Sequence, residues 1–271
     1  MHHPDAVTLP WLAAARARAS LAPLRPRIPL HTAQGQAFGS ADAELLAKIA
    51  SQAASDGHGV LQKAEHAWAL TTSPEQGLDS LAVLLRRLGR TGPWRDEKLD
   101  VCDPAGAPLG AIERGTVRAL GIATRAVHLV GKTPDGRHWV QQRSFSKAND
   151  PGLWDTLMGG MVAAGESTME ALERETQEEA GLALQALRDL RAGGRVSIRR
   201  PSDEVPGGHG YMTEAIDWFE ATVPFGLAPV NQDGEVQQFE LLSRSDVVLR
   251  LEAGAFTLEA TLVLAAALGL D

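Results

Sequence analysis

The sequence predicts an α+β fold in which a smaller, mostly helical N-terminal domain (residues 1–118) precedes a sandwich of helices and mixed sheet (residues 119–271). Two observations carry this prediction. Apolar residues recur at helical spacing in the first part of the chain, whereas strand-like runs alternate with a few helices in the second. The hydrophobic content of 44% and the charged content of 22% are ordinary for a globular protein, so a sizeable core is expected.

The N-terminal domain should contain two amphipathic helices. Residues 41–54 place Leu45, Leu46 and Ile49 at helical spacing, and residues 78–88 repeat this pattern with leucines. Gly89 and the Thr-Gly-Pro stretch that follows it end the second helix. A short strand or two is expected near residues 99–112. This domain could cover the substrate pocket as a lid or specificity domain.

Strands dominate the prediction for the C-terminal half. Six strand-like runs follow one another at residues 126–132, 137–143, 154–162, 195–200, 211–222 and 239–242. The first two flank a Thr-Pro-Asp-Gly turn, and the third is interrupted by Gly159-Gly160. A Pro/Gly-rich loop is expected at residues 201–210. Two helices close the chain, and the apolar stretch at residues 258–270 is expected to pack on the core.

The charge and cysteine content restrict the partners and the compartment. A formal charge of −8 argues against a general nucleic-acid binder and requires metal ions or local Arg and Lys for an anionic substrate. Cys102 is the single cysteine, and no stretch reaches about 18 apolar residues. We therefore expect a cytoplasmic protein without a membrane partner, and we leave a homodimer open. Residues 11–30 lack acids, as transit peptides do, but their three prolines favour a folded or docking segment.

A helix is strongly predicted at residues 168–180. Ser167 and Glu170 fit a capping box, and Gly181 stands where a helix end favours a left-handed residue. At about 100° per residue, one face of this helix should be buried. Its members are Met169, Leu172, Thr176 and Ala180.

A second arc of the same helix carries Glu175, Glu178 and Glu179. Like charges at this spacing repel one another, and a divalent cation would remove that penalty. Ligands that are all oxygen suit magnesium or manganese. The alternative, a solvated acidic face, fits Glu170 and Glu173 better than these three residues.

The helix lies inside a motif that resembles the Nudix box. The pattern Gly, five residues, Glu, seven residues, Arg-Glu-x-x-Glu-Glu-x-Gly-apolar is matched by Gly160, Glu166, Arg174, Glu175, Glu178, Glu179, Gly181 and Leu182. Thr176 stands where the pattern more often has an aliphatic residue, which concerns packing rather than metal binding. The resemblance implies an α/β/α sandwich and a metal-dependent hydrolase that cleaves a diphosphate linked to another moiety.

The resemblance also implies the roles of individual residues. The implied ligands of magnesium, or alternatively manganese, are Gly159 through its carbonyl, Glu175, Glu178 and Glu179. Arg174 orients the carboxylates and Glu166 supports the site from the loop. Bound metal would neutralise phosphate oxygens and lower the pKa of a water that attacks phosphorus. The general base often lies outside the box in this family; Glu235 is our candidate, and a turn acid without a chemical role is the alternative.

A looser resemblance covers about two thirds of the chain. It is to a Nudix subgroup related to the front half of fungal thiamine pyrophosphokinase, and it is carried by Trp94-Arg95-Asp96-Glu97, Ile112-Glu113-Arg114, Gly121-Ile122, Val127-His128, Arg143, Ser144, Lys147, Pro151-Gly152, Asp155 and Asp233-Gly234-Glu235-Val236. It implies thiamine diphosphate, or its oxidised analogues, as the substrate.

Three side chains are candidates for binding such a substrate. Arg143 and Lys147 could hold the terminal phosphate, with a purely solubilising surface role as the alternative. Trp154, or Trp139, could stack on a heterocycle, although a strand tryptophan more often packs in a core. His128 and His209 lack the spacing of a zinc site, so structural or exposed roles are expected.

Three other functions remain open. The substrate could be an ADP-sugar, a dinucleotide polyphosphate or a nucleoside triphosphate. The reaction could be the isomerisation of isopentenyl diphosphate, but this needs a cysteine acid/base and Cys102 lies outside the predicted Nudix domain. The chain could also be a ligand-sensing module without hydrolysis, although such modules usually lack box carboxylates that are all present here.

Overall fold

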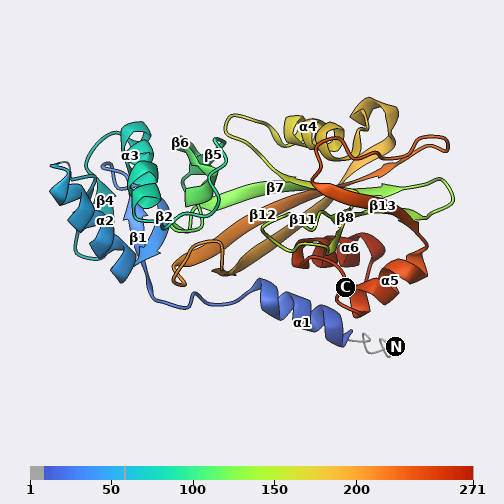
Figure 1. Cartoon of the computed structure of the whole chain (residues 1–271), viewed down its shortest axis with the longest axis horizontal. Helices are drawn as coiled ribbons and strands as arrows, with labels where there is room; N and C mark the ends of the chain where they lie inside the picture. The colour runs from blue at the N-terminus through green and yellow to red at the C-terminus, as the bar shows by residue number, and fades with distance from the viewer. Residues whose placement is uncertain (1–8, 58, 271) are drawn as a thin grey trace, which may run out of the picture.

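The computed structural model describes residues 9–57 and 59–270. A seven-stranded mixed sheet forms its centre, with the order β11-β12-β7-β8-β13, and with β10 paired to β7 and β9 paired to β8 (Figure 1). The strands are β7 (Ala123–Lys132), β8 (His138–Arg143), β9 (Trp154–Asp155), β10 (Met158–Met161), β11 (Arg188–Ser202), β12 (Gly210–Thr222) and β13 (Val236–Leu242). The predicted sandwich in the C-terminal half is confirmed.

Helices cover both faces of this sheet. On one side lies α4 (Thr168–Ala180); on the other lie α1 (Pro10–Ala19), α5 (Arg244–Glu252) and α6 (Leu258–Leu268) (Figure 1). Successive side chains of a strand point to opposite faces. Accordingly Val127 and Leu129 of β7 pack in the core beneath α4, while Ala126 and Val130 pack in the core beneath α6. The expected packing of the last helix on the core is confirmed.

Two strand predictions need correction. The expected interruption at Gly159-Gly160 is wrong: β9 ends at Asp155 and both glycines lie inside β10, while the break falls between the two strands. The Pro/Gly-rich loop begins later than expected, because β11 continues through Pro201 to Ser202. Proline is tolerated there because β11 forms an edge of the sheet, where one side of the strand needs no donor.

The N-terminal region is a mixed α/β unit, and the prediction of a mostly helical domain is wrong. A four-stranded sheet of order β2-β1-β4-β3 consists of β1 (Arg27–His31), β2 (Ala37–Asp42), β3 (Leu61–Lys63) and β4 (Trp68–Leu70). These strands have six residues or fewer, and Pro29 and Gly39 weaken their sequence signal. The ribbon of β5 (Lys98–Cys102) and β6 (Pro108–Glu113) confirms the strands expected near residues 99–112.

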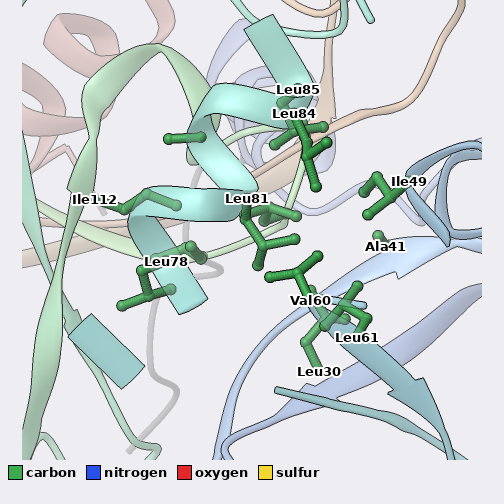
Figure 2. Packing of buried hydrophobic residues seen from close by; sticks show 14 of the residues in the cluster. Leu30, Ala41, Ile49, Val60, Leu61, Leu78, Leu81, Leu84, Leu85 and Ile112 are labelled. Carbon is green, nitrogen blue, oxygen red and sulfur yellow. The ribbon is translucent and has the colours of Figure 1, made fainter. Parts of the chain in front are cut away.

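Both predicted N-terminal helices are confirmed as α2 (Ala43–Ser55) and α3 (Pro74–Arg87). Their apolar faces meet over the small sheet, where Ile49 and Leu81 pack near Leu30 and Val60 (Figure 2). The unit therefore has a core of its own.

The two parts of the chain are joined through the long β11–β12 hairpin. Val205, near the tip of the hairpin, is buried in the N-terminal core. The buried His209 lies with Nδ1 2.7 Å from a carboxylate oxygen of Asp42, whose other oxygen caps α2. This contact confirms a structural role for His209. The domain boundary at residue 118 remains a prediction.

Helix α1 belongs to the core beneath α6, although it precedes the N-terminal unit in sequence. We expect Leu12→Ala to lower the free energy of unfolding by about 2–4 kcal/mol, because Leu12 is only 3% exposed. Leu24→Ala is the matched control, since Leu24 is 69% exposed, and its effect should stay within about 0.5 kcal/mol. Urea unfolding measures both; equal effects would contradict the packing of α1.

Candidate active site

Helix α4 begins and ends as the sequence predicts. Ser167 and Glu170 form both hydrogen bonds of the capping box, and Gly181 adopts φ +63°. The predicted buried face is correct for Leu172, Thr176 and Ala180 but wrong for Met169, which is 44% exposed. The face that packs on the sheet also includes Ala171 and Glu179, so it is turned away from Met169.

A bidentate ion pair ties α4 to the loop before it. Arg174 donates through Nε and Nη2 to the two carboxylate oxygens of Glu166, at 2.7 and 2.9 Å, and also donates to the carbonyl of Met161. The backbone N–H of Ala163 donates to the same glutamate. Hydrogen bonds from Arg174 lower the pKa of Glu166, so this carboxyl is ionised at neutral pH. The pair holds the loop against the helix.

Glu175 occupies space that is free only because residue 160 is a glycine. A Cβ on Gly160 would overlap the carboxyl group of Glu175. Arg174 Nη1 lies 2.9 Å from the same carboxylate. Burial raises the pKa of Glu175, and the nearby Arg174 opposes this effect.

Gly160→Ala is therefore expected to displace Glu175 and lower turnover by about tenfold or more, since a small misplacement of a catalytic group is costly. The fold should survive, because φ at this position is not left-handed. Gly165→Ala is a poor control because Gly165 has φ +79°, so Ala163→Gly, in the same loop, is used instead. Steady-state kinetics with circular dichroism would check this; unchanged turnover by Gly160→Ala would contradict the close approach.

Glu179 is the most deeply placed acid of the helix, with 3% exposure. One of its oxygens accepts from Gln141 Nε2 at 2.8 Å and from the N–H of Gly159 at 3.2 Å, and Lys147 Nζ lies 3.6 Å from the other. Burial raises the pKa of Glu179 to about 7; Lys147 opposes the rise and Glu175 adds to it. Two buried like charges on adjacent turns favour a cation between or beside them.

Glu178 takes a different direction. Its side chain is 53% exposed, it accepts from Arg174 Nη1 at 3.1 Å, and it does not line the cavity described next. Within residues 9–57 and 59–270, no three His, Cys, Asp or Glu side chains are already arranged to hold a metal ion. The oxygens of Gly159, Glu175 and Glu179 nevertheless fit a hard divalent cation. Burial is the main cause of the raised pKa of both glutamates, and a bound cation would oppose this effect as Arg174 and Lys147 do.

A cavity of about 470 Å³ opens beside these residues. Five predicted site residues besides Gly159 line it: Arg143, Lys147, Glu175, Glu179 and Glu235. The N-terminal unit supplies further walls, including Pro93, Arg95 and Arg114. The cavity therefore combines box residues with segments from distant parts of the chain.

Lys147 connects the box to the candidate base. Its ammonium lies 2.5 Å from Glu235 and 3.6 Å from Glu179, so it stands between two carboxylates. Burial acts to raise the pKa of Glu235, but the ion pair with Lys147 outweighs it and holds that pKa below its usual range. Glu235 is consequently ionised at neutral pH while it is paired with Lys147.

Arg143 lies on the same wall. Its guanidinium donates to the carbonyl of Asn149 at 3.1 Å and lies 3.7 Å from Asp155. Both candidate phosphate-binding cations are thus positioned by the loop that follows β8.

Trp154 is not brought into the cavity. It packs partly buried against the core beneath α6, with the guanidinium of Arg250 4.5 Å from its ring centre. Neighbouring strand residues face opposite sides, and it is Asp155, the next residue of β9, that lines the cavity. Trp139 packs against the core beneath α4. No aromatic ring of Phe, Tyr or Trp lines the cavity among the described residues, so stacking on either tryptophan is disfavoured.

His128 lines the cavity in addition to its structural contacts. Its Nδ1 is 3.0 Å from Thr156 Oγ1, and that hydroxyl donates to the carbonyl of Met158, so Nδ1 carries the proton. Burial lowers the pKa of His128, which keeps the ring neutral. The subgroup resemblance includes His128 only as part of the Val127-His128 motif, and the place of His128 on the cavity wall follows from its pairing opposite Gly159 in the β7–β10 ladder.

Several other charged residues of the cavity were not identified from sequence, among them Arg118, Arg200, Glu214 and Glu259. These four come from β11, β12, α6 and the segment before β7. Cys102 does not line the cavity. In the described part of the chain, no helix has the length and apolar character needed to cross a membrane.

A family model that covers half of the chain identifies its family. The family model described as the NUDIX domain matches residues 123–262. Nudix hydrolase 24, chloroplastic, of Arabidopsis thaliana is 29% identical over 181 residues, which cover 64% of this chain and 48% of the relative. An uncharacterised Nudix hydrolase of Streptomyces coelicolor is 31% identical over 141 residues, covering 44% and 76%. A crystal structure of a Deinococcus radiodurans protein aligns with TM-score 0.47 and 24% identity over 59% of this chain and 92% of that one. The chain spans about half the length of the Arabidopsis relative.

Proposed function

Because this chain belongs to the Nudix hydrolase family, we propose that it hydrolyses a small organic diphosphate with the help of magnesium or manganese. The observation that carries the proposal is the meeting of Glu175 and Glu179 with Lys147 and Arg143 around one cavity. Acidic oxygens that can hold a metal thus face cations that can hold a phosphate.

The residues that would hold the metal are Glu175, Glu179 and the carbonyl of Gly159, and Glu178 would join them only after leaving Arg174. When bound, the metal neutralises charge on phosphate oxygens and lowers the pKa of a water. Gln141 and the N–H of Gly159 hold the Glu179 carboxylate in one orientation. The Arg174–Glu166 ion pair keeps the loop and helix from separating.

Phosphate binding falls to two cations, Arg143 at the end of β8 and Lys147 in the loop that follows. Lys147 would exchange its ion pair with Glu235 for the terminal phosphate, and Arg143 would add a second charge. Glu235, released from the lysine, would then take the proton of the attacking water as general base. This assignment of the base is supported by its position on the cavity wall and by its ionised state.

We propose thiamine diphosphate, or its oxidised analogues, as the substrate class. The support is the looser subgroup resemblance, whose segments at residues 94–97 and 112–114 include the cavity residues Arg95 and Arg114. A volume of about 470 Å³ suits a ligand of this size. We propose the cytoplasm as the compartment, supported by the single cysteine.

A substrate screen tests the proposal. Purified protein with magnesium is offered thiamine diphosphate, oxidised thiamine diphosphate, ADP-ribose and a nucleoside triphosphate, and released phosphate or nucleotide is measured. We expect metal-dependent turnover that is fastest with the thiamine compounds. If only ADP-ribose is turned over, the proposed thiamine substrate class is wrong. If none of the compounds is turned over, the proposed hydrolysis is contradicted. Mass spectrometry separates hydrolysis from isomerisation, which is disfavoured because Cys102 lies off the cavity.

A further inference from the structure

A second group of polar residues lines the cavity apart from the Nudix box. It comprises Arg118, Arg200, Glu214, Thr257 and Glu259, contributed by β11, β12, the N-terminus of α6 and the segment before β7. The charges that act most strongly on Glu259 are Glu214, Arg200 and Asp155, none of which belongs to the box. The cavity thus has two polar regions with different neighbours.

Most members of this second group already have partners in the protein. Arg118 donates to Glu214 at 2.7 Å and to Thr124 at 3.0 Å. The hydroxyl of Thr257 donates to Asp155 and accepts from the backbone of α6. These residues form a fixed frame.

Glu259 and Arg200 are the exceptions. Among the described residues, no other side chain forms a hydrogen bond or an ion pair within 4 Å with the carboxyl of Glu259. This carboxyl has one hydrogen-bonding contact, with the backbone N–H of Glu259 itself. Arg200 is close enough to Glu259 to lower the pKa of that carboxyl. Its buried Nε has no hydrogen-bond partner among the described residues. Most buried donors in a folded protein have partners. Both residues line the cavity, so the carboxyl of Glu259 and the guanidinium of Arg200, for which no hydrogen bond or ion pair is found among the described residues, can serve a ligand as acceptor and donor.

The charges around Glu259 decide whether the phosphate groups or the organic group of the substrate could bind here. Glu214 is paired with Arg118 and Asp155 lies 3.7 Å from Arg143, so Glu259 is the acid of this region that has no ion-pair partner among the described residues, and phosphate is better placed beside Lys147. Burial, reinforced by Glu214, raises the pKa of Glu259 to about 7, so a ligand that brings a positive charge or an N–H would relieve the site. Met212, Pro201 and Ala126 line the cavity too and offer apolar surface to a ring.

We propose that Glu259 and Arg200 form a subsite for the organic half of the substrate, and that it selects a nitrogen heterocycle carrying an N–H donor next to an acceptor. Glu259 accepts from the N–H group, and Arg200 donates to the ring nitrogen or carbonyl. This inference rests on the proposed diphosphate hydrolysis for its biological meaning, but the subsite can be tested by binding alone.

Binding of phosphate-free heterocycles is the direct test. Calorimetry and saturation-transfer NMR are carried out with thiamine, adenosine and cytidine on the full chain, on Glu259→Gln and on Arg200→Met. The control is Glu252→Gln, an exposed glutamate of α5 outside the cavity. Loss of a hydrogen bond to a charged group predicts about ten- to a hundredfold weaker binding for Glu259→Gln.

Kinetics supply the second readout. The ratio of kcat/KM for thiamine diphosphate to that for isopentenyl diphosphate, which has no nitrogen, should fall about tenfold in Glu259→Gln, mainly through KM, and stay unchanged in Glu252→Gln.

The two proposals fail in different ways. A chain that binds a heterocycle through Glu259 but cleaves no diphosphate would overturn the hydrolase function and support the subsite. A chain that cleaves diphosphates but binds none of the three heterocycles, or whose Glu259→Gln variant binds them as tightly as the wild type, would overturn the subsite and leave hydrolysis intact. Circular dichroism of both cavity variants confirms that weaker binding does not come from unfolding.

Discussion

Replacing Glu179 with Gln is expected to lower kcat for magnesium-dependent diphosphate hydrolysis by about a hundred- to a thousandfold, the usual cost of losing one preorganised charge-stabilising group. The amide has the same shape and keeps an oxygen for the hydrogen bonds from Gln141 and Gly159. It lacks the negative charge that a divalent cation requires. The variant should also bind manganese more weakly, as measured by electron paramagnetic resonance without substrate.

Glu173→Gln is the matched control for this change. Glu173 lies on the same helix but outside the cavity, so its replacement should leave kcat and manganese affinity nearly unchanged. Activity of Glu179→Gln within a factor of about three of the wild type would show that the metal assignment is wrong.

Glu179→Gln should also change the stability of the fold, in a direction that follows from the pKa of Glu179. Burial raises the pKa of Glu179 to about 7 in the folded protein, above about 4.3 in the unfolded chain. The folded state is therefore favoured by protonation of Glu179 at low pH, and this advantage is lost as the pH rises through 7. Without metal, Glu179→Gln should melt at the same or a higher temperature than the wild type at pH 8. A clearly lower melting temperature would contradict the burial of an uncompensated charge.

The largest expected loss of stability comes from Arg118→Met, at about 3–5 kcal/mol. The guanidinium of Arg118 and the carboxylate of Glu214 are both buried and lie 2.7 Å apart, and Thr124 bonds to each of them. Removal of the arginine leaves the glutamate buried without its counter-charge. The double variant Arg118→Met/Glu214→Leu should recover most of the loss, because neither charge then remains.

The destabilisation should depend on pH. Burial acts to raise the pKa of Glu214, but Arg118 outweighs it and holds that pKa below its usual range. The ion pair therefore stabilises the wild type above about pH 4.3, and this contribution is lost as the pH falls further through the lowered pKa. In Arg118→Met the glutamate can protonate more readily. Urea unfolding should give a smaller difference between the two proteins at pH 4 than at pH 7; a difference that grows in acid would contradict the pair.

Local signals explain how much of the site could be predicted from the sequence. The capping box at Ser167 and the C-terminal Gly181 act within one turn of their helix, so the bounds of α4 follow from neighbouring residues. The burial of Glu179 and the exposure of Glu178 do not, because they depend on how the helix is rotated against the sheet. Glu178 and Glu179 lie on the same arc of the helix and were expected to act together. In the structure Glu179 accepts from Gln141, whereas Glu178 accepts from Arg174.

Non-local pairing explains what could not be predicted. The parallel pairing of β1 with β4 joins segments almost forty residues apart, and β3 and β4 have only three residues each. Likewise, Arg118 meets Glu214 across 96 positions of the chain. Such contacts leave no periodic pattern in the sequence, so the small N-terminal sheet and the second polar region of the cavity were both missed.

The cavity draws its walls from separate segments, and this arrangement bears on how the protein can evolve. The carboxylates of α4 depend on the loop before it and on β8 and β10, whereas Arg95 and Arg114 lie in the N-terminal region and Glu259 lies in α6. A mutation at one of these wall positions removes no hydrogen bond or ion pair of Arg174 or Glu166. Ligand preference can therefore change through residues far from the box in sequence without any change in α4 itself.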